Sequence, residues 1–387
     1  MRFFVFILFF LTTSLRSQSL QETEAKGTGM TKSDALQDAL RNAVSQAAGV
    51  SIMSETKVEN YLIVSDAISS NTKGYIQSYE VIKETPFPDR FEVILKAKVT
   101  TETVKADFQL LARQIGGMRF LVMPDPKETN EANLATLQIV SNKINDALST
   151  KGCRYIERDR FNSLKKEAIA LMESSKSDKL SYAQQLGMLS DAQFILTVSD
   201  LQKTSQPGAF DISKGDIYSF NVKVMDNCTG EGLGSLSFAN MQASKNTEDA
   251  IGKAVNEKFE KLFGTITSYI GSWLNNGTPY ELRFYQTGTY RDFRDLRKKL
   301  KEDASFGGEM EITSVLNYTK LNCTFKKQAD DLADKLLDLA DEIPTFKEQK
   351  LDVKHIFGRQ ISMAPQKYII PNLPSKSLDT NQTSIQH

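Results

Sequence analysis

Histidine is almost absent from this sequence, which has only two among its 387 residues, His355 and His387. A Ser-His-Asp or Cys-His catalytic arrangement would have to use His355, because His387 falls in a tail that is predicted to be disordered. His355 lies in a predicted strand, where a structural or surface histidine is the simpler interpretation. A histidine-rich zinc site is excluded by number, and no Cys-x-x-Cys pair is present. The sequence therefore assigns no catalytic, metal-binding or cofactor-binding residue, and we expect no cofactor.

The chain also has few cysteines and a formal net charge of zero. Three cysteines are an odd number for an oxidising compartment. Cys153 and Cys228 could pair and leave Cys323 as a buried thiol, or all three could be buried as small apolar side chains. Lysine plus arginine equals aspartate plus glutamate at 48 each, so the overall field attracts neither nucleic acid nor an anionic membrane. We expect no nucleic-acid partner.

Long apolar runs are missing as well. The longest, Phe3–Leu11, follows Arg2 and precedes small polar residues, which is the pattern of a secretory leader. Nine residues are too few to span a bilayer, which takes about 20. We expect residues 1–19 to be a signal peptide cleaved near Ser17 or Ser19. No cysteine lies near that point for a lipoprotein anchor, so the mature protein is expected to be periplasmic or secreted, with no transmembrane segment.

Residues 20–100 predict a small β-α-β-β domain. Thr31 and Asp34 form a capping box, and the helix that follows carries an apolar stripe made mostly of alanine. Gly49 is predicted to end this helix in a left-handed conformation, with an extended segment from Val50. After a polar excursion, two strands are predicted over 74–83 and 91–99, joined by a turn at 86–89.

The rest of the chain predicts two further domains. Residues 101–117 read as a connector helix, and 118–275 alternate strand and helix before a β-meander and a long helix, which is typical of an α/β domain. Residues 279–358 follow the β-α-β-β-α-β order of a ferredoxin-like domain. Residues 359–387, with three prolines and little apolar periodicity, predict a disordered tail. The expected fold class is thus α+β and α/β in three domains.

Two stretches resemble known families. The entry Gly27-x-Gly29, the alanine-striped helix and the strand at 74–76 resemble the N-terminal domain of the flagellar T-ring protein FlgT. The run 155–161, Leu186-Gly187 and the strand 192–196 are similar to the periplasmic α/β domain shared by the curli export protein CsgG and the TolB N-terminal domain. This resemblance implies an exported bacterial envelope protein without catalytic residues, in a family of uncharacterised function.

Several candidate sites have a structural explanation that competes with the functional one. Gly27 and Gly29 lack the third glycine of a dinucleotide fingerprint, so a bulge or turn explains them better than a phosphate cradle. The lone Trp273 is interpreted as a packing residue at a domain junction. The segment 157–160 is interpreted as a helix start capped by Asp159, with a partner-facing charged corner as the alternative. Carboxylate pairs are numerous and fall in turns or on polar helix faces: Asp125 with Glu128, Asp330 with Asp331, and Asp341 with Glu342.

One dense basic run covers 291–301, and acidic residues are interleaved with it. This mixture indicates a solvated helix with local ion pairs rather than an RNA-binding face, although contact with an anionic envelope polymer stays open. The favoured function is a non-enzymatic periplasmic scaffold or assembly factor of a secretion, motility or outer-membrane machine. Its partners would be envelope proteins, and it could form an oligomer. The alternative is a hydrolase or binder of an envelope polymer, acting through a carboxylate cleft between the second and third domains.

Overall fold

The computed structural model describes residues 20–52, 61–174, 182–205, 216–243, 246–315 and 317–371. Helices and three sheets mix in these ranges, which confirms the predicted α+β and α/β class. By its contacts the chain forms two compact units, one from 1–55 with 71–107 and one from 56–70 with 108–387. The predicted signal peptide, 1–19, lies outside the described residues. No helix in the described ranges is long and apolar enough to cross a membrane.

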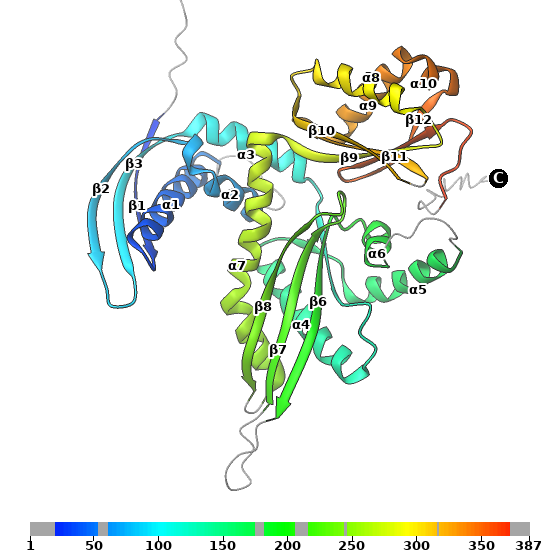
Figure 1. The fold of residues 1–387 in the computed structure, drawn as a ribbon. Coiled ribbons are helices and arrows are strands. Elements are labelled where there is room, and N and C mark those ends of the chain that lie inside the picture. The colour runs from blue at the N-terminus through cyan, green and yellow to red at the C-terminus, as the bar shows by residue number, and fades with distance from the viewer. Residues whose placement is uncertain are drawn as a thin grey trace, which may run out of the picture. The chain divides into compact units, whose positions relative to one another are not determined.

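The first unit is a three-stranded antiparallel sheet with one long helix. Strands β1 (Leu20–Gly29), β3 (Phe91–Thr100) and β2 (Ile76–Pro86) lie in that order, and helix α1 (Lys32–Ile52) packs on β1 and β3. A Cβ added at Gly27 would lie 2.1 Å from the backbone nitrogen of Ala39. The alanine stripe and this glycine therefore let the helix lie directly on the sheet (Figure 1).

The start of α1 is as predicted, but its end is not. The Thr31 hydroxyl accepts a bond from the Asp34 amide at 3.1 Å, and the Asp34 carboxylate accepts one from the Thr31 amide at 3.2 Å. Helix α1 then continues through Gly49 to Ile52, and Gly49 does not have positive φ. The expected helix end at Gly49 is wrong. Burial of Ala47 and Ala48 against the sheet outweighs a glycine penalty of about 1 kcal/mol.

The expected polar excursion contains a helix. Helix α2 (Tyr61–Ser70) buries Ile63, Val64 and Ile68 and packs on α7 in the second unit. A short 3-10 turn, η1 (Thr72–Gly74), then leads into β2. Gly74 has no atom within 4 Å of an added Cβ, so this position does not require glycine.

The α/β domain of the second unit is a five-stranded sheet between helices. After α3 (Thr101–Ile115) the strands are β4 (Arg119–Pro124), β5 (Arg154–Tyr155), β6 (Phe194–Ser205), β7 (Asp216–Asp226) and β8 (Gly232–Ala243). Their order is β5-β4-β6-β7-β8, with β4 parallel to both neighbours and β7 antiparallel to β6. Helices α4 (Glu131–Thr150) and α7 (Thr247–Asn276) cover one face, and α5 (Arg158–Ser174) and α6 (Tyr182–Ser190) cover the other (Figure 1).

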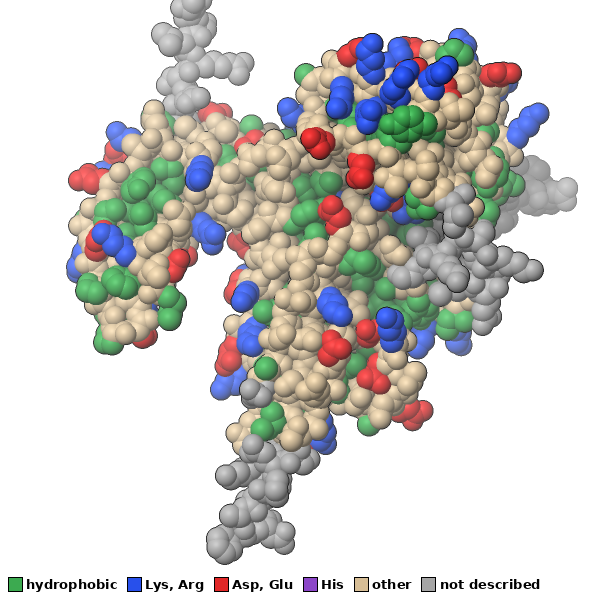
Figure 2. Space-filling model, in the orientation of Figure 1, with side chains coloured by type: hydrophobic (Ala, Val, Ile, Leu, Met, Phe, Trp, Pro, Cys, Tyr) green, Lys and Arg blue, Asp and Glu red, His purple; other side chains and the backbone are tan. Residues whose placement is uncertain are grey.

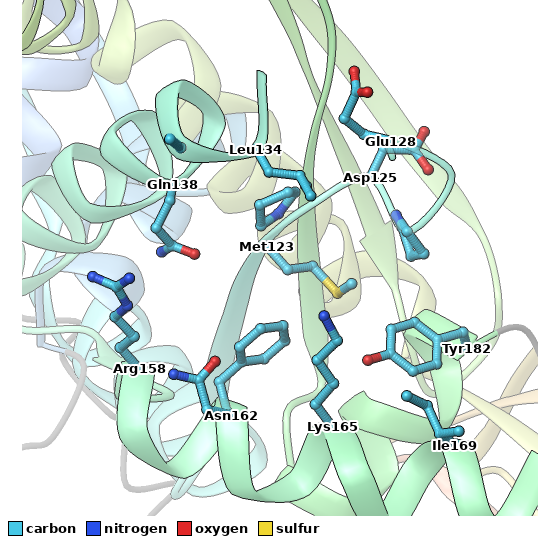
Figure 3. A pocket seen from close by; sticks show the side chains of 14 residues that line it. Met123, Asp125, Glu128, Leu134, Gln138, Arg158, Asn162, Lys165, Ile169 and Tyr182 are labelled. Carbon is cyan, nitrogen blue, oxygen red and sulfur yellow. The ribbon is translucent and has the colours of Figure 1, made fainter. Parts of the chain in front are cut away.

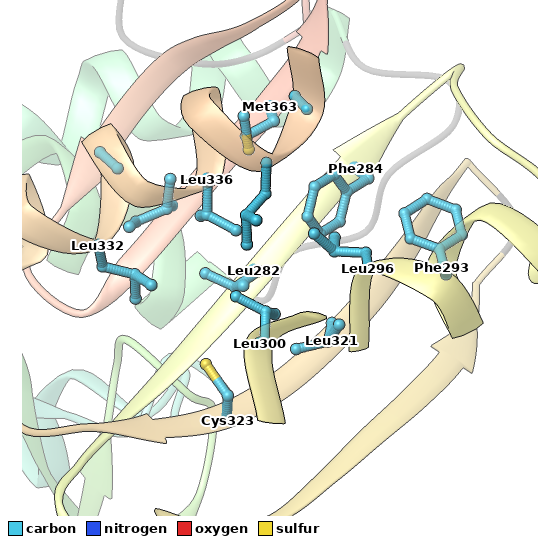
Figure 4. Close-up of a cluster of buried hydrophobic side chains, with 14 of the residues drawn as sticks. Leu282, Phe284, Phe293, Leu296, Leu300, Leu321, Cys323, Leu332, Leu336 and Met363 are labelled. Carbon is cyan, nitrogen blue, oxygen red and sulfur yellow. The ribbon is translucent and has the colours of Figure 1, made fainter. Parts of the chain in front are cut away.

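The C-terminal domain, residues 278–371, has one more strand than its sequence suggests. The expected order is present as β9 (Thr278–Tyr285), α8 (Tyr290–Lys301), β10 (Phe306–Ser314), β11 (Tyr318–Phe325), α9 (Ala329–Glu342) and β12 (Leu351–Phe357). A short helix α10 (Pro344–Gln349) precedes β12. Helices α8 and α9 pack on the sheet through buried leucine and phenylalanine side chains (Figure 4).

The extra strand, β13 (Gln360–Pro365), corrects the predicted tail. It forms a hairpin with β12 and inserts parallel to β9, so the sheet order is β10-β11-β9-β13-β12. The chain is ordered as far as Pro371 in the described ranges, and only 372–387 of the predicted tail, with His387, lie outside them. Ile361 and Met363 are part of the hydrophobic core, and their burial stabilises this strand. The prolines nearby in the sequence favour a disordered tail instead.

Candidate functional site

A cavity of about 730 Å³ opens at the carboxyl end of β4, between α4 and α5. Strand β4 has parallel neighbours on both sides, and the helices that follow β4 and β5 lie on opposite faces of the sheet. This is where open α/β sheets leave a crevice for a ligand. Its position and size make this α4–α5 cavity the candidate binding site (Figure 3).

Helix α5 forms one wall of the cavity with a polar stripe. Arg158, Asn162 and Lys165 recur at helical spacing and project toward α4 (Figure 3). All three are exposed. The neighbouring apolar positions divide between two faces, because Leu164 and Ala168 enter the core beneath the sheet while Phe161 and Ile169 line the cavity.

The start of α5 differs from the prediction. Glu157, not Asp159, caps it: a Glu157 carboxylate oxygen accepts a bond from the Asp159 amide at 3.3 Å, and its carbonyl accepts one from Phe161. Arg158, the next residue, lines the cavity. The alternative of a partner-facing charged corner stays a prediction.

The β4–α4 loop supplies two carboxylates at the rim, Asp125 and Glu128. Asp125 accepts a bond from the Lys127 amide at 2.9 Å. Glu128 accepts one from the Asn130 amide at 2.8 Å and one from the Asn133 side chain at 3.0 Å. These bonds hold the pKa of the Glu128 carboxyl below its usual range. The predicted pair is therefore brought together, and it also braces its own loop.

Helices α4 and α6 complete the lining. Leu134 and Gln138 face the cavity from α4, and the Gln138 amide nitrogen donates to Asn142 at 3.1 Å, which leaves its carbonyl oxygen toward the cavity side (Figure 3). Tyr182 of α6 lines the other end. Its hydroxyl oxygen is buried and has no hydrogen-bond partner among the described residues. Burial raises the pKa of Tyr182, so the phenol stays protonated and can donate.

A second polar cluster lies where the α/β domain meets the C-terminal domain. Arg359, in the turn between β12 and β13, is 2% exposed and donates both terminal nitrogens to the carboxylate of Asp226, each at 2.7 Å. Asp226 is fully buried and also accepts bonds from the hydroxyls of Tyr269 and Thr229 and the amide of Cys228. The bidentate pairing compensates the two buried charges, although the Arg359 Nε is buried without a hydrogen-bond partner among the described residues.

This Asp226–Arg359 junction occupies the place where a carboxylate cleft was expected. The guanidinium carbon lies 4.6 Å from the ring centre of Trp273, so the lone tryptophan does lie at a domain junction. A Cβ on Gly358, whose φ is +52°, would lie 2.9 Å from the sulfur of Cys228. The hairpin turn is thus inserted tightly against the α/β domain, and the Asp226 carboxylate at this junction is engaged by Arg359.

The remaining sequence candidates lie outside the cavity lining. His355 is half-buried on β12 and does not line the cavity. Asp331 caps α9, and Glu342 pairs with Lys299. Figure 2 shows Lys and Arg side chains gathered over α8 with acidic side chains among them, and Arg294 pairs with Asp295 at 3.2 Å. All three cysteines are free and buried. The described ranges contain no cluster of metal-ligating side chains.

No protein-family model matches this sequence, and no curated protein matches it. Among solved structures, the chain is similar to lipoprotein GNA1162 from Neisseria meningitidis, at 12% identity and a TM-score of 0.26, over 38% of this chain and 97% of that one. It is similar to hypothetical protein CT253 from Chlamydia trachomatis at 13% and 0.24, over 40% and 97%. A third likeness is to the C-terminal domain of LpoB from Salmonella enterica at 16% and 0.20, over 35% and 94%.

These three structures come from bacteria, and one is a lipoprotein by name. Identities and TM-scores this low assign neither a family nor a function to the chain. The resemblance to FlgT, TolB and CsgG stays a prediction.

Proposed function

We propose that this protein is a non-enzymatic scaffold or assembly factor of the cell envelope that acts by binding other proteins. The observation that carries the proposal is the division of charge in the α4–α5 cavity. Its carboxylates are engaged by amide donors of their own loop, whereas Arg158 and Lys165 make no ion pair among the described residues. Such a lining offers groups for binding and holds its acids in structural roles.

The hydrolase alternative needs a carboxylic acid that stays protonated near neutral pH, which requires a raised pKa. Glu128 has the opposite shift, because its backbone and side-chain hydrogen bonds favour the charged form. Between the second and third domains, where the sequence suggested a carboxylate cleft, Asp226 is paired with Arg359. Both observations favour binding over hydrolysis.

Two further features suit a scaffold. The junction ties the α/β and C-terminal domains through a buried, bidentate ion pair, which fixes the geometry of the surfaces they present. In the first unit, the edge strand β2 exposes large apolar side chains, with Tyr79 48% and Ile82 54% exposed. Helix α1 packs on β1 and β3, so β2 extends beyond it. Apolar side chains on a sheet edge are typical of surfaces that meet another chain.

In-cell crosslinking of the full chain, followed by reconstitution with the purified captured protein, tests the proposal. We expect at least one envelope protein to be captured and then to bind directly. Asp125→Asn/Glu128→Gln serves as the matched variant, since it removes both rim charges and keeps the side-chain shapes. A protein that captures no partner and cleaves an envelope polymer, with cleavage lost in this variant, would overturn the proposal.

A further inference from the structure

We infer that the α4–α5 cavity binds an acidic peptide segment of a partner protein. An apolar side chain of that segment would lie on Met123 and Phe161, and carboxylates on either side of it would pair with Arg158 and Lys165. The inference rests on the proposed function, because it gives the chemistry of the partner that the scaffold would hold.

The charge expected of the ligand follows from which charged side chains of the cavity have no ion-pair partner in the described ranges. Arg158 and Lys165 line the cavity, are exposed, and have no ion pair within the described ranges. Asp125 and Glu128 accept bonds from their own loop, which compensates part of their charge. The cations are therefore the groups that gain most from a ligand, and they select carboxylates.

The spacing of the cations favours a chain over a small anion. Arg158 and Lys165 are seven residues apart on α5, which separates their Cα atoms by about 10 Å along the helix axis. A single carboxylate cannot pair well with both side chains at once across that span. Two acidic side chains on one peptide, with an apolar residue between them, match the sequence of groups along the wall: cation, Phe161 with Asn162, cation.

The amide groups of the cavity indicate a peptide rather than a lipid. Asn162 and Gln138 face each other from opposite walls, and each carries a donor and an acceptor, as a peptide group does (Figure 3). The buried Tyr182 hydroxyl has no partner in the described part of the chain and can donate to a peptide carbonyl. Met123, Leu134 and Ile169 provide an apolar surface for one or two side chains, and the cavity of about 730 Å³ falls within the range of ordinary ligand sites.

Selection from a random dodecapeptide phage library on the immobilised full chain tests this inference. We expect enrichment of peptides with an apolar residue flanked by aspartate or glutamate. For a fluorescein-labelled selected peptide, Arg158→Glu/Lys165→Glu should weaken binding roughly tenfold or more, which corresponds to about 1.4 kcal/mol or more. Arg160→Glu/Lys166→Glu is the matched control, because it makes the same charge change on exposed α5 positions outside the lining. It should leave the dissociation constant within about twofold.

Three outcomes would overturn the inference: enrichment of basic or uncharged peptides, an equal loss in the control variant, or binding of phosphatidylglycerol vesicles in place of peptides. Repeating the in-cell crosslinking with Arg158→Glu/Lys165→Glu separates this inference from the proposed function. If the wild-type chain captures envelope partners and the variant captures the same ones, the cavity assignment fails and the scaffold stands. If the wild-type chain captures none, the scaffold itself fails.

Discussion

Replacing Arg359 by methionine tests the energetics of the domain junction. The side chain of methionine keeps much of the volume, but Asp226 would lose a bidentate partner while it remains fully buried. Breaking a buried ion pair from one side costs about 3–5 kcal/mol. Tyr269, Thr229 and the Cys228 amide still donate to the carboxylate in the variant. We therefore expect the lower end, about 3 kcal/mol at pH 7.

The assay uses the only tryptophan of the chain. Trp273 lies against the Arg359 guanidinium, so its fluorescence reports the junction, while far-UV circular dichroism reports the whole fold. In urea, the fluorescence transition of Arg359→Met should move to lower concentration than that of the wild type. Asp226→Asn/Arg359→Met should recover most of the loss, because no charge stays buried. Arg294→Met, which breaks an exposed pair, should cost at most about 1 kcal/mol.

The difference in stability between the wild type and Arg359→Met should depend on pH, in a direction that the structure predicts. Burial would raise the pKa of Asp226, but Arg359 and the other donors hold it below the usual value. The stability from this group is therefore present above the unfolded pKa of about 4 and is lost as pH falls through the folded pKa. In Arg359→Met, no cation opposes the effect of burial on Asp226, so the pKa of the Asp226 carboxyl rises. The free energy of unfolding of this variant should therefore fall as pH rises from about 4. The gap between wild type and variant should shrink from pH 7 to pH 3. If the free energy of unfolding of Arg359→Met, measured by fluorescence at pH 7, lies within about 1 kcal/mol of the wild-type value, the reasoning is refuted.

Three further results are expected. Burial raises the pKa of each cysteine thiol to about 12, so a thiol reagent at pH 8 should modify the native chain far more slowly than the urea-unfolded one; rapid native labelling would contradict this. Gly27→Ala should lower the thermal stability of the first unit, because its Cβ would meet the α1 backbone at Ala39, whereas Gly74→Ala should be neutral; equal effects would contradict the close packing. A fragment of residues 278–371 should give dispersed NMR spectra and a fragment of 278–358 should not, since only the first contains β13; two folded fragments would show that β13 is dispensable.

Local periodicity accounts for the elements that were predicted well. The Thr31 capping box, α3 and the long α7 carry their signals in neighbouring residues, and the structure has them at or near the expected bounds. Strand β13 carries no such signal. Gln360 and Ser362 are buried polar residues, and Gln360 donates to the Cys228 carbonyl at 3.2 Å from 132 residues away. The Gln360 side chain suits a buried strand only because the Cys228 carbonyl accepts its hydrogen bond.

The candidate cavity was only partly visible in the sequence. The sequence indicates Asp125 with Glu128 and the segment 157–160, but only as separate features. Lys165, Gln138 and Tyr182 come from three helices, and their convergence depends on how α4 and α5 flank the end of β4. One usable signal was present in α5, where apolar residues fall on two faces although a surface helix needs only one.

Asp226 shows why the sequence alone does not reveal a buried ion pair. It is the last residue of β7, directly before the turn to β8, and its carboxylate accepts a bond from the amide two residues on, which is the ordinary reason for an aspartate beside a turn. The bond from the Cys228 amide uses one carboxylate oxygen of Asp226. It gives no indication that the carboxylate also pairs with an arginine 133 residues later. Arg359 is equally inconspicuous beside Gly358 in a proline-containing segment. Each residue has a sufficient local explanation, so the ion pair that joins two domains becomes visible only when the hairpin of β12 and β13 is placed against the α/β domain.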